Sequence, residues 1–171
     1  MSERTAAMTE RIIAANGLSA KVHTVSDGVI AGTREDASGR ALVTQLVDAG
    51  YAIAESRVVA DGSDSVAAAL REMSDGFAGL IVTTGGTGFA PRDQTPEGTR
   101  QVIEREAPGL AEAMRLVNPL GRLSRGIAGI LGQVVICNTP GSPKGCVEQL
   151  GAILDVLHHA LRLLADAPTA H

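Results

Sequence analysis

Apolar residues occur along this chain in two alternating arrangements. Short runs that are almost entirely apolar, such as residues 79–84, are typical of buried strands in a parallel sheet. Longer runs in which apolar residues recur every three or four positions, as Val66, Leu70 and Met73 do, predict helices with one buried face. The expected strands are residues 21–25, 51–59, 79–84, 127–130 and 134–138. Helices are expected at residues 40–49, 63–74 and 110–116. A further helix is expected to be capped by Thr95 with Pro96 at its first position, and one long last helix is expected after residues 139–144.

Strands and helices alternate through most of the chain, which predicts an α/β fold with a mostly parallel sheet and helices on both faces. Only residues 131–133 separate the last two strands, so this pair is expected to form a hairpin and to make one edge strand antiparallel. The folded domain is expected to cover residues 21–166. Residues 1–20 are expected to be an N-terminal extension with a short helix at 8–15, and residues 167–171 a C-terminal tail.

The composition narrows the classes of function. The chain has 171 residues, 44% of them hydrophobic but only 2% aromatic, so its core is aliphatic and it lacks the aromatic faces on which single-stranded nucleic acid stacks. A net charge of −4 argues against nucleic acid or an anionic membrane as a partner. No apolar run has membrane-spanning length and no signal peptide is visible among the polar first residues, so we expect a cytoplasmic protein. Its two cysteines lack the spacing of a zinc site.

Polar turns follow four of the expected strands. Because the carboxyl ends of parallel strands lie at one edge of a sheet, and ligands bind there in open α/β folds, these turns are expected to form one site. Two of them lead into helices that begin with proline, where free N–H groups and the helix dipole attract anions. The turns are residues 26–28, 61–63, 84–88 and 138–142.

Residues 83–97 are the most informative of these segments, with three glycines and three threonines before Asp93. Such a loop presents bare N–H groups to a phosphate, and we expect the amides of residues 85–88 to do so. Asp27, Asp61 and Asp93 at the same edge would repel a phosphate unless a cation lies between them, which points to Mg²⁺. Lys144 and Arg125 are expected to add positive charge. Neither the P-loop pattern nor GxGxxG is present.

Four segments together resemble the MogA/MoaB family of molybdenum-cofactor biosynthesis proteins, to which domains of gephyrin are related. Residues 83–99, TTGGTGFAPRDQTPEGT, are similar to its glycine-rich signature. Residues 26–39 resemble its N-terminal motif, residues 123–129 its LSRGxAG motif, and residues 140–144 its PGxPK loop. The resemblance covers residues 21–164, which is nearly the whole expected domain.

The resemblance implies a three-layer α/β/α sandwich, usually a homotrimer, that transfers AMP from ATP to the terminal phosphate of molybdopterin with the help of Mg²⁺. It assigns catalysis and metal binding to Asp61 and Asp93, although Ala60 and Gly62 replace the usual Pro and Glu beside Asp61. It also implies contact with a molybdenum-inserting MoeA-type enzyme. The expected ATP- and molybdopterin-binding residues are Ser26, Asp27, Gly85, Gly86, Thr87, Gly88, Ser124, Pro140, Gly141, Ser142 and Lys144.

Other interpretations of the same residues stay open at this stage. Asp27 and Ser124 serve equally well as turn-forming residues, and residues 34–36 most simply form a solvated loop. A non-catalytic molybdopterin-binding protein, or a scaffold protein, would have the same motifs. Adjacent His158 and His159 do not have the i, i+4 spacing of metal ligands on a helix.

Overall fold

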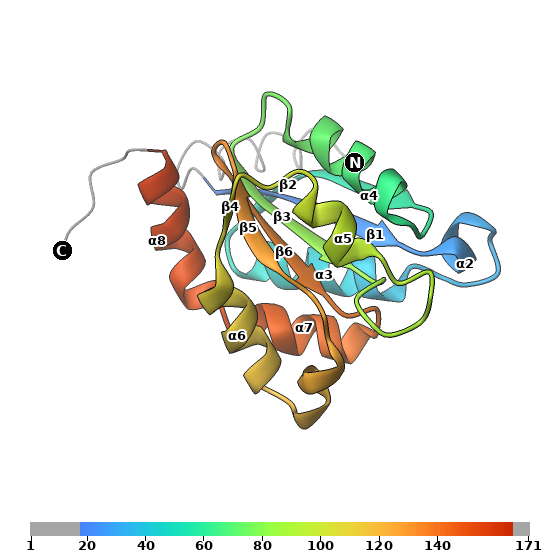
Figure 1. Cartoon of the computed structure of the whole chain (residues 1–171). Coiled ribbons are helices and arrows are strands. Elements are labelled where there is room, and N and C mark those ends of the chain that lie inside the picture. The colour runs from blue at the N-terminus through green and yellow to red at the C-terminus, as the bar shows by residue number, and fades with distance from the viewer. Residues whose placement is uncertain (1–17, 166–171) are drawn as a thin grey trace.

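The computed structural model describes residues 18–165 and is built on a sheet of six strands in the order β2-β1-β3-β6-β5-β4 (Figure 1). The first four strands in this order are parallel, and β5 pairs with β6 in an antiparallel hairpin, which confirms the predicted topology. The two-residue β4, not predicted, pairs antiparallel with β5 at the edge. The strands are β1 (Ser19–Val25), β2 (Ala52–Val59), β3 (Gly79–Thr84), β4 (Arg105–Glu106), β5 (Ala128–Leu131) and β6 (Val134–Thr139).

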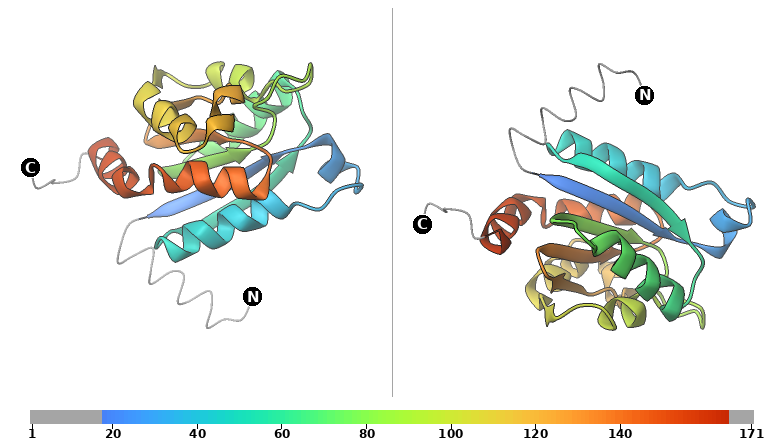
Figure 2. Two further views of the ribbon diagram at one scale, coloured as in Figure 1. Left: turned by 90° about the horizontal axis from the view of Figure 1, so that it is seen from below. Right: turned by 90° about the horizontal axis from the view of Figure 1, so that it is seen from above.

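Helices cover both faces of the sheet and complete the three-layer sandwich (Figures 1 and 2). On one face, Val22, Leu80 and Val82 pack in a core cluster with side chains of α3, α6, α7 and α8. On the other face, Ile81 and Ile136 pack in a cluster with side chains of α4. The helices are α2 (Asp27–Ile30), α3 (Ala37–Asp48), α4 (Ser63–Ser74), α5 (Thr95–Arg100), α6 (Pro108–Leu116), the 3-10 helix η1 (Pro119–Leu123), α7 (Pro143–Gly151) and α8 (Leu154–Leu164).

The prediction of one long last helix was wrong, because the chain leaves helical geometry between α7 and α8. Ile153 has φ −124° and ψ −8°, and Gly151 directly before the break is a poor helix former. The apolar positions are buried all the same: Leu150, Ile153 and Leu157 are all 1% exposed or less. Apolar periodicity therefore predicted which side chains are buried, but not the break.

Three further local predictions differ from the structure. Thr95 is the first residue of α5 and not its cap; its hydroxyl donates to the carbonyl of Gly85 at 2.9 Å, because the side chain is buried beneath the glycine loop. The loop after β1 contains the short helix α2, whose N-cap is Ser26. Asp36 is not in a solvated loop, since it caps α3 by accepting from the N–H of Gly39 and binds the Thr24 hydroxyl.

β1 begins at Ser19, two residues before the predicted start of the domain. The predicted helix at residues 8–15, the rest of the N-terminal extension and the tail at 167–171 lie outside the described residues. Within residues 18–165, no helix combines the length and the apolar character that crossing a membrane requires. The turns that end β1, β2, β3 and β6 lie at one edge of the sheet, where they surround a cavity.

Candidate active site

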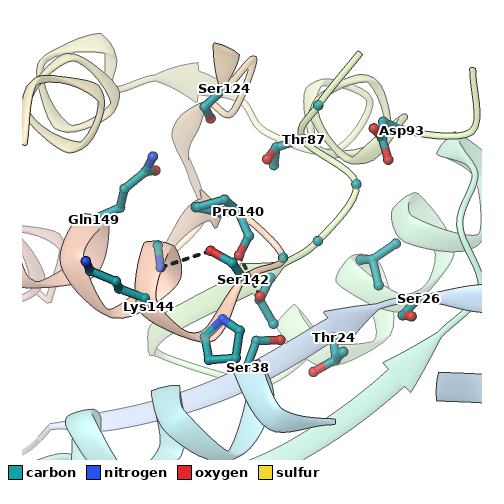
Figure 3. Close-up of a pocket in the computed structure, with 18 of the residues that line it drawn as sticks. Thr24, Ser26, Ser38, Thr87, Asp93, Ser124, Pro140, Ser142, Lys144 and Gln149 are labelled. Atoms are coloured by element: carbon teal, nitrogen blue, oxygen red, sulfur yellow. Dashed lines mark hydrogen bonds between the residues drawn. The ribbon is translucent and has the colours of Figure 1, made fainter. Parts of the chain in front are cut away.

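A cavity of about 940 Å³ lies at the carboxyl edge of the parallel strands (Figure 3). The turns after β1, β2, β3 and β6 line the cavity together with residues 118–124 and α7. Of the residues predicted to form the site, all line the cavity except Asp27 and Arg125. The predicted residues that line it are Ser26, Asp61, Gly85, Gly86, Thr87, Gly88, Asp93, Ser124, Pro140, Gly141, Ser142 and Lys144.

The two predicted catalytic carboxylates lie against the glycine loop. A Cβ atom placed on Gly86 would lie 3.4 Å from Oδ1 of Asp61, and one placed on Gly88 would lie 2.8 Å from Oδ2 of Asp93. Gly86 also has φ +68°, a conformation that side chains disfavour. Glycine at these positions therefore allows the bare loop backbone and both carboxylates to share one site.

The backbone amides of the loop are not all available to a ligand. The N–H of Gly85 donates to the carbonyl of Thr139 at 3.1 Å, so the prediction that this amide binds phosphate is wrong. The N–H groups of Gly86, Thr87 and Gly88 have no acceptor among the described residues. Consecutive free amides are the groups from which anion-binding nests are built.

Asp27 has a role that the sequence did not indicate. Its carboxylate accepts hydrogen bonds from the guanidinium of Arg92 at 2.6 and 3.1 Å and from the N–H of Asp61 at 3.1 Å. The hydrogen bond from Arg92 lowers the pKa of Asp27, so the carboxylate stays charged. Asp27 is thus directed toward Arg92 and the Asp61 backbone and not into the cavity.

Arg125 does not supply charge to the cavity, contrary to the prediction. Its guanidinium donates to the carbonyl of Gly88 at 2.8 Å and to the carbonyl of Asp93 at 2.5 Å, and it is paired with Glu97. The hydrogen bond from Arg125 lowers the pKa of Glu97, which keeps this ion pair charged. Arg125 therefore fixes both ends of the glycine loop. Lys144 lines the cavity with an 85% exposed side chain, and its Nζ lies 3.8 Å from the carboxylate of Glu148.

Three serines of the cavity each accept a hydrogen bond from a nearby backbone amide. Ser26 accepts from Val29, and Ser142 accepts from Gly145 as the N-cap of α7. The hydroxyl of Ser124 accepts from the N–H of Gly126 at 3.2 Å. In each case the hydroxyl proton remains available to donate to a ligand, so shaping a turn and binding a ligand are compatible.

Several cavity residues had no signal in the sequence. Asn118 and Leu120 lie in and beside η1, far in sequence from the glycine loop, and Glu148 and Gln149 lie on the turn of α7 that faces them. Tertiary packing alone brings these segments together. Arg92, in contrast, stands next to Asp93 and was detectable as part of the glycine-loop motif.

The carboxylates of the site fit a nucleotide-bound magnesium ion better than a metal held by protein alone. In the region from residue 18 to 165 there is no cluster of three or more His, Cys, Asp or Glu side chains that could hold a metal ion. Asp61 and Asp93 nevertheless line one cavity beside free amides. Mg²⁺ commonly binds one or two carboxylates and takes its other ligands from substrate phosphates and water, so this pair is sufficient.

The fold and the site together define an α/β protein with a cavity, lined by free backbone amides and two carboxylates, at the carboxyl edge of a parallel sheet. The model of the family described as "Probable molybdopterin binding domain" matches residues 21–159. The chain therefore belongs to this molybdopterin-binding-domain family.

Individual relatives agree with this assignment. The chain is 38% identical over 152 residues to the molybdopterin adenylyltransferase of Helicobacter pylori, covering 84% of this chain and 85% of that protein. It is 39% identical over 152 residues to the molybdenum cofactor synthesis protein cinnamon of Drosophila melanogaster, covering 85% of this chain but only 25% of that longer protein. The crystal structure of the molybdopterin biosynthesis enzyme MoaB of Thermus thermophilus superposes with a TM-score of 0.82 at 44% identity, covering 88% of this chain and 98% of that one.

Proposed function

We propose that this protein is a molybdopterin adenylyltransferase, which transfers AMP from ATP to the terminal phosphate of molybdopterin in a Mg²⁺-dependent reaction. The observation that carries the proposal is the placement of Asp61 and Asp93 against Gly86 and Gly88 in one cavity. The name of the Helicobacter pylori relative, which aligns over most of both chains, supports the same reaction.

In this reaction an oxygen of the pterin's terminal phosphate attacks the α-phosphorus of ATP, and the bond from that phosphorus to the bridging oxygen breaks to release pyrophosphate. The amides of Gly86, Thr87 and Gly88 donate to the phosphate oxygens and hold them in position. Asp61 and Asp93 hold Mg²⁺, which when bound neutralises the charge of the triphosphate. Positioning and charge neutralisation dominate in phosphoryl-type transfer, so no covalent protein nucleophile is needed.

The acceptor phosphate is assigned to three polar residues of the cavity outside the glycine loop. Ser124, Ser142 and Lys144, which line the cavity from η1, the turn after β6 and α7, offer two hydroxyl donors and a cation (Figure 3). The ammonium group of Lys144 attracts the phosphate of molybdopterin, and it leaves Asp61 and Asp93 available to Mg²⁺.

The direct test is turnover with purified protein, molybdopterin, ATP and Mg²⁺, following pyrophosphate release and formation of adenylylated molybdopterin. The variant Asp93→Asn should lower turnover by at least a hundredfold, because removing an electrostatic ligand of the transition state typically has effects of that order. Asp75→Asn, at an exposed position outside the cavity, is the matched control and should be as active as the wild type. Tight molybdopterin binding without turnover by the wild type would instead indicate a non-catalytic binding protein, and no binding of either substrate would favour a scaffold.

The proposal extends to the cellular context that the family resemblance implies. We expect a cytoplasmic homotrimer that passes its product to a MoeA-type enzyme. Its folded domain begins at β1, which starts at Ser19, two residues before the predicted 21–166 domain. Light scattering of the purified protein measures the oligomeric state directly, and a stable monomer would remove the trimer from the proposal.

A further inference from the structure

Arg34 is a cation of the cavity that the proposed chemistry leaves without a role. Within residues 18–165, the arginine and lysine side chains that line the cavity are those of Arg34 and Lys144. Lys144 is assigned above to the acceptor phosphate and lies 3.8 Å from Glu148. The guanidinium of Arg34 is exposed and forms no ion pair or hydrogen bond with any residue that the structure describes. Arg34 is therefore the cavity cation with no counter-ion among these residues.

The two acidic residues that follow Arg34 in the sequence are engaged elsewhere. Glu35 pairs with Arg40, with 3.0 Å between the charged atoms. Asp36 caps α3, where its carboxylate accepts from the N–H of Gly39 at 3.0 Å. Neither carboxylate binds Arg34, so its guanidinium is available to an anionic ligand of the cavity.

Hydrogen bonds through α2 connect Arg34 to the predicted metal ligand Asp61. The N–H of Asp27, the first residue of α2, donates to Oδ2 of Asp61 at 2.9 Å. The carbonyl of the next residue, Gly28, accepts from the N–H groups of Thr33 at 3.0 Å and Arg34 at 3.2 Å. The loop after α2 is thus folded back onto this helix. Two consecutive residues of α2 hold both Asp61 and the backbone of Arg34.

The order of the strands associates Arg34 with the triphosphate and not with the acceptor phosphate. β1, which leads to Arg34, lies between β2, which leads to Asp61, and β3, which leads to the glycine loop. β6, which leads to Lys144, lies on the other side of β3. Mg²⁺ bound to a nucleotide commonly bridges oxygens of the β- and γ-phosphates. A nucleotide whose Mg²⁺ is held by Asp61 therefore brings these two phosphates toward the β1 side of the glycine loop.

We infer that Arg34 binds the β- and γ-phosphates of ATP and stabilises the pyrophosphate that leaves. As an oxygen of the acceptor phosphate forms its bond to the α-phosphorus, the bond from that phosphorus to the bridging oxygen breaks, and its electron pair stays on pyrophosphate. A guanidinium presents N–H donors in a planar fork that matches two phosphate oxygens, so Arg34 is suited to this added charge. The inference rests on the proposed function and adds a residue to its leaving-group side.

The variant Arg34→Gln tests the assignment, because glutamine removes the charge and keeps a polar side chain. Equilibrium titrations of wild type and variant, each in the presence of Mg²⁺, measure the affinities for ATP, pyrophosphate and molybdopterin separately. Loss of charge-assisted hydrogen bonds should weaken ATP and pyrophosphate binding about tenfold or more and leave molybdopterin binding unchanged. Arg162→Gln, at an exposed position of α8 outside the cavity, changes the net charge equally and should alter none of the affinities.

Two further measurements separate phosphate binding from a structural role. Because Arg34 has no side-chain partner among residues 18–165, Arg34→Gln should not lower the melting temperature, whereas loss of a structural ion pair would. Arg34→Lys keeps the charge but not the planar fork, so its affinity for pyrophosphate should lie between those of the wild type and Arg34→Gln.

The possible results distinguish this inference from the proposed function. A wild type that binds ATP and pyrophosphate but forms no adenylylated molybdopterin contradicts the proposed function, while the Arg34→Gln titrations still decide the inference. Selective loss of molybdopterin affinity in Arg34→Gln would assign Arg34 to the acceptor phosphate and overturn the inference. Unchanged affinities, the same losses in Arg162→Gln, a lowered melting temperature with all three affinities reduced, or a wild type that does not bind pyrophosphate would overturn it as well.

Discussion

Asp27 and Asp61 form a reciprocal pair in which the backbone N–H of each residue donates to the carboxylate of the other. The two distances are 2.9 Å to Asp61 and 3.1 Å to Asp27. The pair connects the turns that follow β1 and β2, and Arg92 reinforces it by binding the Asp27 carboxylate and the Asp61 carbonyl. Asp27 therefore serves to hold Asp61 in position, which explains why an acid that does not line the cavity stands at its edge.

Replacing Asp27 should impair the reaction without removing a ligand of the metal. In Asp27→Asn the amide cannot form the charged pair with Arg92, so Asp61 loses orientation. We expect kcat to fall roughly tenfold, the usual effect of a lost orienting contact beside a metal ligand, with molybdopterin affinity unchanged. Glu106→Gln breaks another exposed arginine–carboxylate pair, the one with Arg100, and serves as the control. Equal activities of the two variants would contradict a positioning role for Asp27.

Gly86 and Gly76 allow a matched comparison of backbone strain with steric exclusion. Both have positive φ, +68° and +64°, but an added Cβ at Gly86 would collide with the hydroxyl of buried Thr95, whereas Gly76 has open space. Both alanine variants should lose roughly 1–2 kcal/mol of stability from the left-handed backbone. Gly86→Ala should in addition lose measurable ATP binding, because the loop must move away from Thr95. Chemical denaturation and ATP titration measure the two effects, and equal ATP affinities in the two variants would contradict the steric argument.

The buried imidazole of His23 predicts a loss of stability in mild acid. His23 is fully buried in β1 and neither ring nitrogen has a hydrogen-bond partner within residues 18–165. Burial, assisted by the charge of Arg57, lowers its pKa to about 4. The unfolded chain takes up the proton near pH 6.5, while the folded protein resists it until about pH 4. The free energy of unfolding should therefore be highest above pH 6.5 and fall by about 3 kcal/mol between pH 6.5 and 4.

Denaturant unfolding as a function of pH measures this effect, and His23→Leu should flatten the curve between pH 6.5 and 4. Asp27 and Glu97 also have lowered pKa values in the folded protein, but their contribution to stability is lost only as the pH falls below about 4, where carboxylates of the unfolded chain take up protons. A slope that is unchanged in His23→Leu would assign the acid sensitivity to other groups.

Arg125 should govern the order of the glycine loop. Its guanidinium binds the carbonyls of Gly88 and Asp93, so Arg125→Lys retains the charge but cannot span both carbonyls and Glu97. We expect faster hydrogen exchange of backbone amides in residues 88–94 and several-fold weaker ATP binding. Arg122→Lys, at an exposed position in η1, should change neither measurement. Exchange rates in the loop that match the wild type would show that Arg125 is dispensable there.

The local physics of the chain determined most of the fold. The apolar run of residues 79–84 can only be stable as a strand covered on both faces, and the observed β3 has these bounds. The spacing of Val66, Leu70 and Met73 likewise predicted α4 with its observed bounds. The short connection between β5 and β6 required a hairpin, and the alternation of elements required parallel strands, which brought the turns containing Asp61 and residues 85–88 to one edge.

Tertiary structure decided what individual polar side chains do there. The sequence could not show that Arg125 pairs with Glu97, that Asp27 orients Asp61, or that the amide of Gly85 donates to Thr139. In each case the two partners are 28 to 54 positions apart in the sequence. Apolar periodicity and turn preferences depend on residues that are close in the sequence, so they can be recognised in the sequence alone. Hydrogen-bond partners across a site depend on how the helices and the sheet pack in the folded protein.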